Sequence, residues 1–202
     1  MDIKVLGTAA AEGWPALFCA CEGCRKAQQY GGHDLRRRTA YAINNDTLID
    51  FGPDIFWQTS RFGVDLSAIS HILVTHSHVD HLNTEDLKWR APGFSQVSHD
   101  LVVYGNQSVL DRLETELDRD LLDYGIRTVL VQPSDTLKVG NLTVTALGAD
   151  HMGSEEEALN FVIREGQSEL LVANDTGWWE ETTWRHLGEC SLSAAFFECT
   201  TG

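Results

Sequence analysis

The chain lacks any uninterrupted apolar run long enough to span a bilayer, so we expect no membrane partner. Its first residues, Met1 to Leu6, are typical of a strand and lack the basic-then-apolar layout of a signal peptide, which makes a cytoplasmic location the expectation. Internal repeats, low-complexity tracts and Pro- or Ser-rich linkers are also missing. The 202 residues are therefore expected to form one domain, 1–202, which is long enough to bury a core.

Basic side chains are scarce. The sequence holds 15 Lys and Arg against 30 Asp and Glu, a formal net charge of -15. Because nucleic-acid binding needs a clustered basic face, this balance argues against a nucleic-acid partner. The one basic run is Arg36 to Arg38. We interpret it as a solvated loop, and contact with an anionic substrate is the alternative.

Histidine is concentrated in one segment, Thr75-His76-Ser77-His78-Val79-Asp80-His81, which directly follows the apolar run Ile72 to Val74. Imidazole nitrogens and carboxylate oxygens are suitable ligands for Zn, Mn or Fe. The spacing H-x-H-x-D-H places these ligands in a short loop after a strand, whereas the helical spacing H-E-x-x-H is absent. The segment therefore predicts a site for two metal ions. A histidine-rich surface loop without metal is the alternative.

Two later residues also follow expected strands. His151 comes after the strand 142–147, and Asp175 comes after the strand 169–173. A site for two metals needs more ligands than one loop supplies, so we expect His151 and Asp175 to complete it.

Cysteine is present in an odd number, five, and three of them crowd together as Cys19, Cys21 and Cys24. In a reducing compartment such a cluster predicts thiolate ligation of a metal rather than disulfides. Three thiolates need one more ligand to make a tetrahedral zinc site, and His33 is a local candidate. Three reduced cysteines without metal are the alternative.

Short apolar runs alternate with turn signals along the chain. We expect a helix over Gln107 to Leu122, closed by Gly125, and two hairpins in the second half, at Gly140-Asn141 and at 165–167. Mixed sheets and helices in two similar halves suggest two packed sheets with helices outside. The expected strands are Ile3–Leu6, Ala40–Ile43, Thr47–Ile49, Ile72–Thr75, Leu101–Tyr104, Leu137–Val139, Leu142–Leu147, Asn160–Arg164, Glu169–Ala173 and Ala194–Phe197.

With its motifs in this order, the sequence resembles the metallo-β-lactamase superfamily, whose α+β fold is an αββα sandwich. The matching residues are Leu48-Ile49-Asp50-Phe51-Gly52, His76, His78, Asp80, His81, His151 and Asp175. The resemblance implies two divalent ions in the active site, the first held by His76, His78 and His151, the second by Asp80 and His81, with Asp175 bridging the two. It also implies that Asp50, although not a ligand, orients a ligand imidazole.

The opening residues Ile3 to Ala10, followed by the cysteine cluster, resemble one branch of this superfamily. That branch contains the cyclic-phosphate phosphodiesterase of carbon–phosphorus lyase pathways and the accessory protein B of pyrroloquinoline quinone biosynthesis. The resemblance implies a structural zinc at Cys19, Cys21 and Cys24, with its fourth ligand a histidine from the carboxyl-terminal region. It also places a last metal-ligand histidine after a further strand. We therefore expect that strand, the last helix and these histidines to lie beyond Gly202. A weakly held second metal is the alternative.

The leading hypothesis for function is a metal-dependent hydrolase that acts on small phosphodiesters, cyclic ones included, through a hydroxide bridging two Zn, Mn or Fe ions. Asp80 and His81 are the residues expected at the reacting centre. The alternatives are a non-hydrolytic accessory protein of quinone-cofactor biosynthesis, a lactone or thioester hydrolase, a transfer-RNA 3′ endonuclease of the same fold, and an iron-dependent redox protein. The substrate partner is expected to be a small phosphodiester. The sequence leaves the oligomeric state open, a homodimer included.

Overall fold

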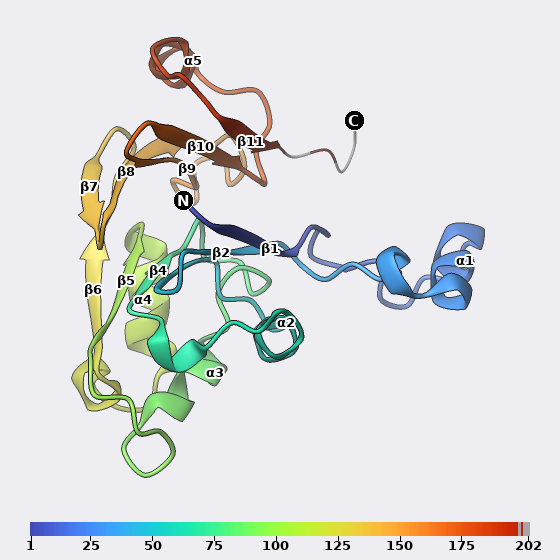
Figure 1. The fold of residues 1–202 in the computed structure, drawn as a ribbon, viewed down its shortest axis with the longest axis horizontal. Helices are drawn as coiled ribbons and strands as arrows, with labels where there is room; N and C mark the ends of the chain where they lie inside the picture. Colours follow the sequence, from blue (N-terminus) through green and yellow to red (C-terminus); the bar gives the residue numbers. More distant parts are fainter. Residues whose placement is uncertain (198, 200–202) are drawn as a thin grey trace.

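The computed structural model describes residues 1–197 and 199, and within them the chain forms two β-sheets that pack against each other (Figure 1). The first sheet has the order β1 (Ile3–Gly7), β2 (Ala40–Ile43), β3 (Thr47–Ile49), β4 (His71–Leu73), β5 (Leu101–Gly105) and β6 (Ile126–Leu130). The second has the order β11 (Ala194–Phe197), β10 (Ser168–Ala173), β9 (Leu159–Glu165), β8 (Leu142–Gly148) and β7 (Thr136–Val139). In the first sheet β3, β4, β5 and β6 run parallel, and in the second β10 and β11 do.

Helices cover the outer faces of both sheets. Ile55 of α2, Leu87 of α3 and Leu113 of α4 share a buried cluster with the first sheet, and Leu187 of α5 packs with Trp179 on the second. Helix α1 instead lies at the end of a segment that projects away from the sheets (Figure 1). The helices are α1 (Glu22–Tyr30), α2 (Ile55–Phe62), α3 (Thr84–Leu87), α4 (Gln107–Glu116) and α5 (Glu181–Gly188), with short 3-10 turns η1 (Gly32–Asp34), η2 (Leu66–Ala68), η3 (Lys88–Arg90) and η4 (Leu121–Tyr124).

The layering follows from the two-residue period of the strands. In β2, Ala40 and Ala42 join the cluster under the helices, while Tyr41 and Ile43 join the cluster between the two sheets. Phe161 of β9 fills that inter-sheet cluster from the other side and is fully buried. The αββα sandwich predicted from the sequence is therefore confirmed.

The hairpins expected at Gly140-Asn141 and at 165–167 are both present, as β7–β8 and β9–β10. The helix predicted over Gln107 to Leu122 is wrong at its end, because α4 stops at Glu116. Leu117 turns to extended backbone, and the separate 3-10 turn η4 follows before Gly125 closes it with a left-handed conformation. The leucine spacing continues past the end of α4, because Leu117 and Leu121 both lie beyond the helix and still pack inward. Leu117 is buried, and Leu121 packs against the core.

None of the helices in the described part of the chain has both the length and the apolar character needed to cross a membrane. The strand, helix and histidines expected beyond Gly202 lie outside the described residues, as do Glu198 and 200–202 themselves.

Candidate metal centre

Four strands bring the expected ligand loops to one edge of the sandwich. In the first sheet β3 and β4 run parallel, so Asp50 and the segment 75–81 emerge side by side. In the second sheet β8 and β10 both pair antiparallel with β9 and therefore point the same way, which places His151 and Asp175 on one side. A hydrogen bond of 2.8 Å from the N–H of Leu159 to the carbonyl of Thr75 joins the two sheets at this edge.

Three imidazoles form a first group of ligand atoms. His76 Nε2 lies 3.0 Å from His78 Nδ1, and His151 Nε2 lies 3.4 Å from the same His78 nitrogen. The three nitrogens all fall within 4.8 Å of one another. His76 is buried, whereas His78 and His151 are exposed, so the group opens toward solvent on one side. Converging imidazole nitrogens of this kind fit one divalent cation.

A second group shares His76 with the first and adds His81 and Asp175. Asp175 Oδ2 lies 2.8 Å from His81 Nε2, 3.8 Å from His76 Nε2 and 3.9 Å from His151 Nε2. This single oxygen therefore faces both groups. Asp80 lies outside the two groups of three, but its Oδ2 is 3.2 Å from His81 Nε2, on the side of the second group.

Asp50 supports this arrangement through its contacts with Thr75 and with the ring of His81. It is fully buried and accepts a 2.9 Å hydrogen bond from the N–H of Thr75, and its Oδ2 lies 2.7 Å from His81 Nδ1. An Nδ1–H that donates to Asp50 leaves the Nε2 lone pair of His81 directed at Asp175, where a metal would lie. Asp50 and Asp175 both adopt left-handed backbone (φ 63° and 49°), a strained conformation that aspartate tolerates better than most residues.

Burial and the neighbouring charges shift the pKa values of three residues in the two ligand groups and beside them. Burial and the nearby His81 lower the pKa of His76 to about 2, so its ring is neutral and offers a lone pair at neutral pH. Burial alone would lower the pKa of His81, but the surrounding carboxylates of Asp50, Asp175 and Asp80 raise it well above its usual value. Burial is the largest single effect on Asp80 and raises its pKa, but the hydrogen bond to His81 and the charge of that ring together outweigh burial and lower the pKa overall. The neutral ring of His76 and the ionised carboxylate of Asp80 suit a divalent metal, whereas a metal that binds His81 must displace a proton from that ring.

Glu156 is a buried carboxylate that sequence reasoning missed. It accepts a 2.8 Å hydrogen bond from the N–H of Ser77 and a 2.5 Å one from the Ser77 hydroxyl, inside the histidine loop. It also accepts a 2.7 Å bond from the amide of Asn106, the residue that caps α4. Glu156 therefore ties the loop that follows His151 to the loop that carries His76 and His78. No signal in the sequence distinguishes it from its neighbours.

Asn160 is a second supporting residue that the sequence did not reveal. Its side-chain amide donates to the carbonyl of Asn174 at 2.9 Å, and it accepts a 2.9 Å hydrogen bond from the indole N–H of Trp179. Tyr41 donates to the side chain of Asn174 at 2.8 Å. These bonds fix the backbone directly before Asp175.

A cleft of about 660 Å³ opens beside Asp175, and the segment between β1 and β2 forms its other wall. That wall carries Trp14 and Arg36. The expectation that Arg36 to Arg38 form one solvated loop is therefore wrong for two of the three arginines. The guanidinium of Arg37 lies over the ring of Trp57, and Arg38 pairs with Asp54 at 3.0 Å.

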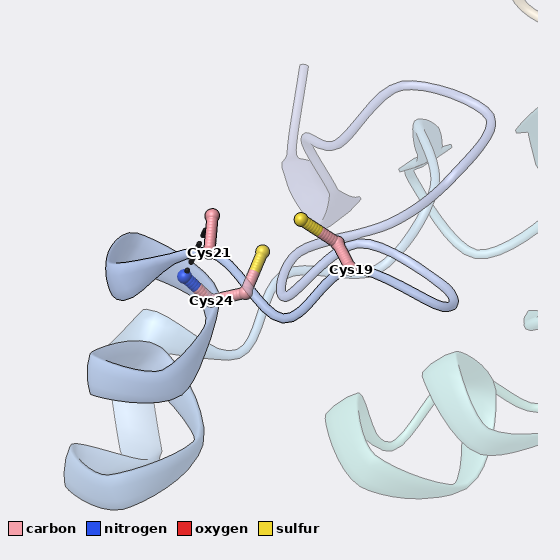
Figure 2. A group of neighbouring side chains, drawn as sticks. All are labelled: Cys19, Cys21 and Cys24. Carbon is pink, nitrogen blue, oxygen red and sulfur yellow. Dashed lines mark hydrogen bonds between the residues drawn. The ribbon is translucent and has the colours of Figure 1, made fainter.

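The three cysteines gather at the start of α1. Figure 2 shows the side chains of Cys19 and Cys24 pointing toward one another, and the three sulfurs lie within 4.8 Å. Cys21 caps the helix, and the N–H of Cys24 donates to its sulfur at 3.4 Å. This hydrogen bond is the main reason that the pKa of Cys21 is lowered to about 7. Such a set of thiols suits zinc. His33, the local candidate for a fourth ligand, is not part of this group within the described residues.

Comparison with known sequences identifies the family. Residues 45–200 match the sequence profile described as the Beta-lactamase superfamily domain, which covers more than half of the chain. The chain belongs to this superfamily. The resemblance drawn from the histidine motif is thereby confirmed.

Two relatives come from the biosynthesis of the coenzyme PQQ. The chain is 32% identical over 92 residues to coenzyme PQQ synthesis protein B of Bradyrhizobium diazoefficiens, a stretch that covers 40% of the chain and only 30% of that relative's length. The crystal structure of Zn²⁺-bound PqqB from Methylobacterium extorquens superposes with a TM-score of 0.77 at 20% identity, covering 98% of this chain and 72% of that one.

A second solved structure is a diphosphatase from the PhnP family, with a TM-score of 0.70 at 21% identity, covering 96% of this chain and 71% of the other. At these identities the likeness of both solved structures concerns the fold. The PqqB structure and the relative from Bradyrhizobium diazoefficiens are consistent with the resemblance to protein B of quinone biosynthesis.

Proposed function

We propose that this protein is a metal-dependent hydrolase that cleaves small phosphodiesters with two divalent ions. The observation that carries the proposal is the shared geometry of the two ligand groups, in which one oxygen of Asp175 faces His76, His81 and His151. Phosphoryl chemistry is supported by the arginine on the facing wall of the cleft and by the diphosphatase of similar fold. Paired cations suit a phosphoryl centre because they stabilise both the attacking and the leaving oxygen.

The side chains of the chain have distinct roles in this proposal. His76, His78 and His151 would hold one ion, and Asp80 and His81 would hold the other. Asp175 would bind both ions. When bound, the ions supply a water of lowered pKa and neutralise charge on the phosphoryl oxygens. Asp80, whose pKa is lowered overall despite its burial, accepts a proton from the attacking water and passes it to the leaving oxygen.

The test is turnover of bis(p-nitrophenyl) phosphate and of a 2′,3′-cyclic nucleotide by protein stripped of metal and reloaded with Zn²⁺, Mn²⁺ or Fe²⁺. We expect hydrolysis only after reloading. His78→Ala should lower kcat/KM by about 100-fold or more, since even residues behind the ligands typically cost about 10–100-fold. His99→Ala is the matched control, because His99 belongs to neither ligand group and contacts the carbonyl of Ile69. Absence of turnover in protein that demonstrably holds two metals would refute the proposal.

A non-hydrolytic accessory role in quinone-cofactor biosynthesis is the second candidate, favoured by the local identity to a PQQ synthesis protein. Metal analysis of the purified protein separates the two. One zinc per chain that is lost in Cys21→Ser but retained in His76→Ala would favour the accessory role, because it would place the metal at the cysteines alone.

A further inference from the structure

We propose that Arg112 of α4 is a positioning residue that directs His78 toward a metal ion, although Arg112 is not itself a ligand. The inference deepens the proposed function and rests on it, because it takes the two histidine groups to be the metal centre. It assigns a role to a guanidinium that contacts the histidine loop at Ser77, between two of the expected ligands.

His78 needs support from its surroundings because its ring is exposed. The ring of His81 has a carboxylate behind it, since Oδ2 of Asp50 lies 2.7 Å from its Nδ1 and sets its direction. Within the described residues, the His78 ring instead lies at hydrogen-bond distance from the rings of His76 and His151. Those rings are expected ligands of the same ion. The direction of the His78 ring therefore depends on the backbone that carries it.

The backbone before His78 is held on two sides through Ser77. The N–H of Ser77, in the peptide group shared with His76, donates to Glu156 at 2.8 Å, and the Ser77 hydroxyl donates to the same carboxylate. The carbonyl of Ser77, in the peptide group shared with His78, accepts a hydrogen bond from the guanidinium of Arg112. A carboxylate thus holds one peptide group and a guanidinium holds the next. Hydrogen bonds to charged groups are roughly twice as strong as bonds between neutral groups.

The guanidinium of Arg112 is itself directed by Glu116, one turn further along α4. Arg112 Nε lies 2.7 Å from Oε1 of Glu116, and Arg112 Nη2 lies 2.9 Å from Oε2. Glu116 also accepts a 2.6 Å hydrogen bond from the hydroxyl of Thr84, a buried residue at the start of α3. Because a guanidinium is planar, two bonds to one carboxylate fix its plane and leave Nη1 for the carbonyl of Ser77.

Helix α4 supports the histidine loop on both sides of Ser77. Its capping residue, Asn106, donates a 2.7 Å hydrogen bond to Glu156, and Arg112 lies further along the same helix. The ion pair with Glu116 also offsets the charge of Arg112, which reduces the repulsion between this guanidinium and a cation at the histidines. The position of His78 is therefore coupled to a rigid element rather than to the loop alone.

The experiment measures the affinity of chelator-treated protein for Mn²⁺, from the loss of the electron paramagnetic resonance signal of the free ion. Mn²⁺ suits imidazoles and carboxylates better than the thiols of the cysteine cluster. Arg112→Met keeps an unbranched side chain and removes the guanidinium. We expect it to weaken Mn²⁺ binding by about 10–100-fold, the usual effect of losing a residue that orients a ligand. Arg119→Met, the same change at an exposed arginine beyond the end of α4, should leave the affinity unchanged.

A double-mutant cycle with His78→Ala separates positioning from general support of the fold. If Arg112 acts through His78, adding Arg112→Met to His78→Ala should weaken Mn²⁺ binding by no more than about twofold further, whereas independent effects would add in full. Glu116→Gln provides a second variant that keeps the guanidinium but removes one of its two carboxylate contacts. It should give a smaller loss of affinity than Arg112→Met, and it tests the inference if Arg112→Met does not fold.

Equal Mn²⁺ affinity in Arg112→Met and Arg119→Met, or losses that add in full with His78→Ala, would overturn the inference. The titrations use no substrate, so they are independent of the proposed function. If no phosphodiester is hydrolysed, the proposed function fails, and the positioning role of Arg112 stands on the Mn²⁺ affinities. If diesters are hydrolysed and Arg112→Met binds Mn²⁺ normally, the positioning role fails alone.

Discussion

At the scale of single residues, the carboxylate of Asp50 serves several hydrogen-bond donors at once. It accepts from both the N–H and the hydroxyl of Thr75 and faces Nδ1 of His81, all in a fully buried position. An amide in its place has one acceptor oxygen instead of two and presents N–H groups to a ring that itself donates. Thr75 or His81 must then lose its acceptor.

Asp50→Asn should therefore lower metal affinity by about 10–100-fold. Competition with a chromophoric chelator measures the affinity directly. Asp123→Asn, an exposed carboxylate in η4, is the control and should leave affinity unchanged. An unaltered affinity in the Asp50 variant would show that His81 does not depend on this carboxylate for its orientation.

Glu156 supports the histidine loop in a different way, because it satisfies donors of the loop backbone. Glu156→Ala leaves the N–H of Ser77 and the amide of Asn106 without their acceptor, and we expect the free energy of unfolding to fall by about 1–3 kcal/mol. Glu157→Ala, at the exposed next position, should change it by less than about 0.5 kcal/mol. Urea denaturation followed by circular dichroism gives both values. Equal stability of the two variants would contradict the role of Glu156.

The spacing of residues in the sequence was enough to nominate the candidate ligands, but it gave no sign of the residues that support their loops. His76, His78, Asp80 and His81 are recognisable because their spacing is unusual, and Asp50 because it ends a strand. Glu156 lies in the polar run Ser154 to Glu157, where only the fold decides which carboxylate turns inward. Asn160 likewise falls within a strand whose burial on both faces no periodicity indicates.

At the scale of elements, the loop after β3 and the histidine loop approach each other closely. The N–H of Phe51 donates to the carbonyl of His81 at 2.7 Å, and the N–H of Asn83 donates to the carbonyl of Phe51 at 2.7 Å. A Cβ on Gly52 would lie 2.0 Å from the carbonyl oxygen of Asp80, a distance that no side chain tolerates. The two loops therefore need a glycine where they cross.

Gly52→Ala should push these loops apart and lower the free energy of unfolding by about 1–3 kcal/mol, as overpacking commonly does, together with a loss of metal affinity. Gly188→Ala is the matched control. No atom lies within 4 Å of a Cβ built there, and the position ends α5 without a left-handed backbone. It should be neutral or slightly stabilising. Normal stability and normal metal binding in Gly52→Ala would contradict the crowding argument.

Strands and hairpins with a clear local sequence pattern were predictable, whereas a strand that forms only by pairing with a neighbouring strand was not. The hairpins β7–β8 and β9–β10 have turn residues between alternating strands, so both were expected. Strand β6 was missed, because its central residues are half-exposed and its sequence Ile-Arg-Thr-Val-Leu has only a weak apolar pattern. It becomes a strand by pairing in parallel with β5 over its whole length, a contact that local sequence does not encode.

At the scale of the whole molecule, the two ligand groups lie where the sheets meet, so an ion bound there links both halves of the sandwich. Ligand binding to the folded state alone stabilises a protein by about 2.7 kcal/mol at one hundred times Kd. For a domain of this size that corresponds to a rise in Tm of about 5–10 °C. Mn²⁺ is the appropriate probe, because carboxylates suit it and thiolates do not.

We expect Mn²⁺ to raise the Tm of chelator-treated protein by this amount in differential scanning fluorimetry. His76→Ala should reduce the rise, since it removes a ligand of the first ion and a ring that lies in both groups. Cys21→Ser should retain it, because the cysteine cluster lies at the start of α1, and this helix projects away from the sheets (Figure 1). An undiminished rise in His76→Ala would place the stabilising ion elsewhere.

The segment between β1 and β2 supplies one wall of the cleft and none of the histidine or aspartate ligands. Its own scaffold is the cysteine cluster and α1, which stand clear of both sheets (Figure 1). The wall of the cleft and the expected ligands are thus built on different segments of the chain. An exchange of residues 8–36 between superfamily members would change that wall while leaving every expected histidine and aspartate ligand of the recipient in place.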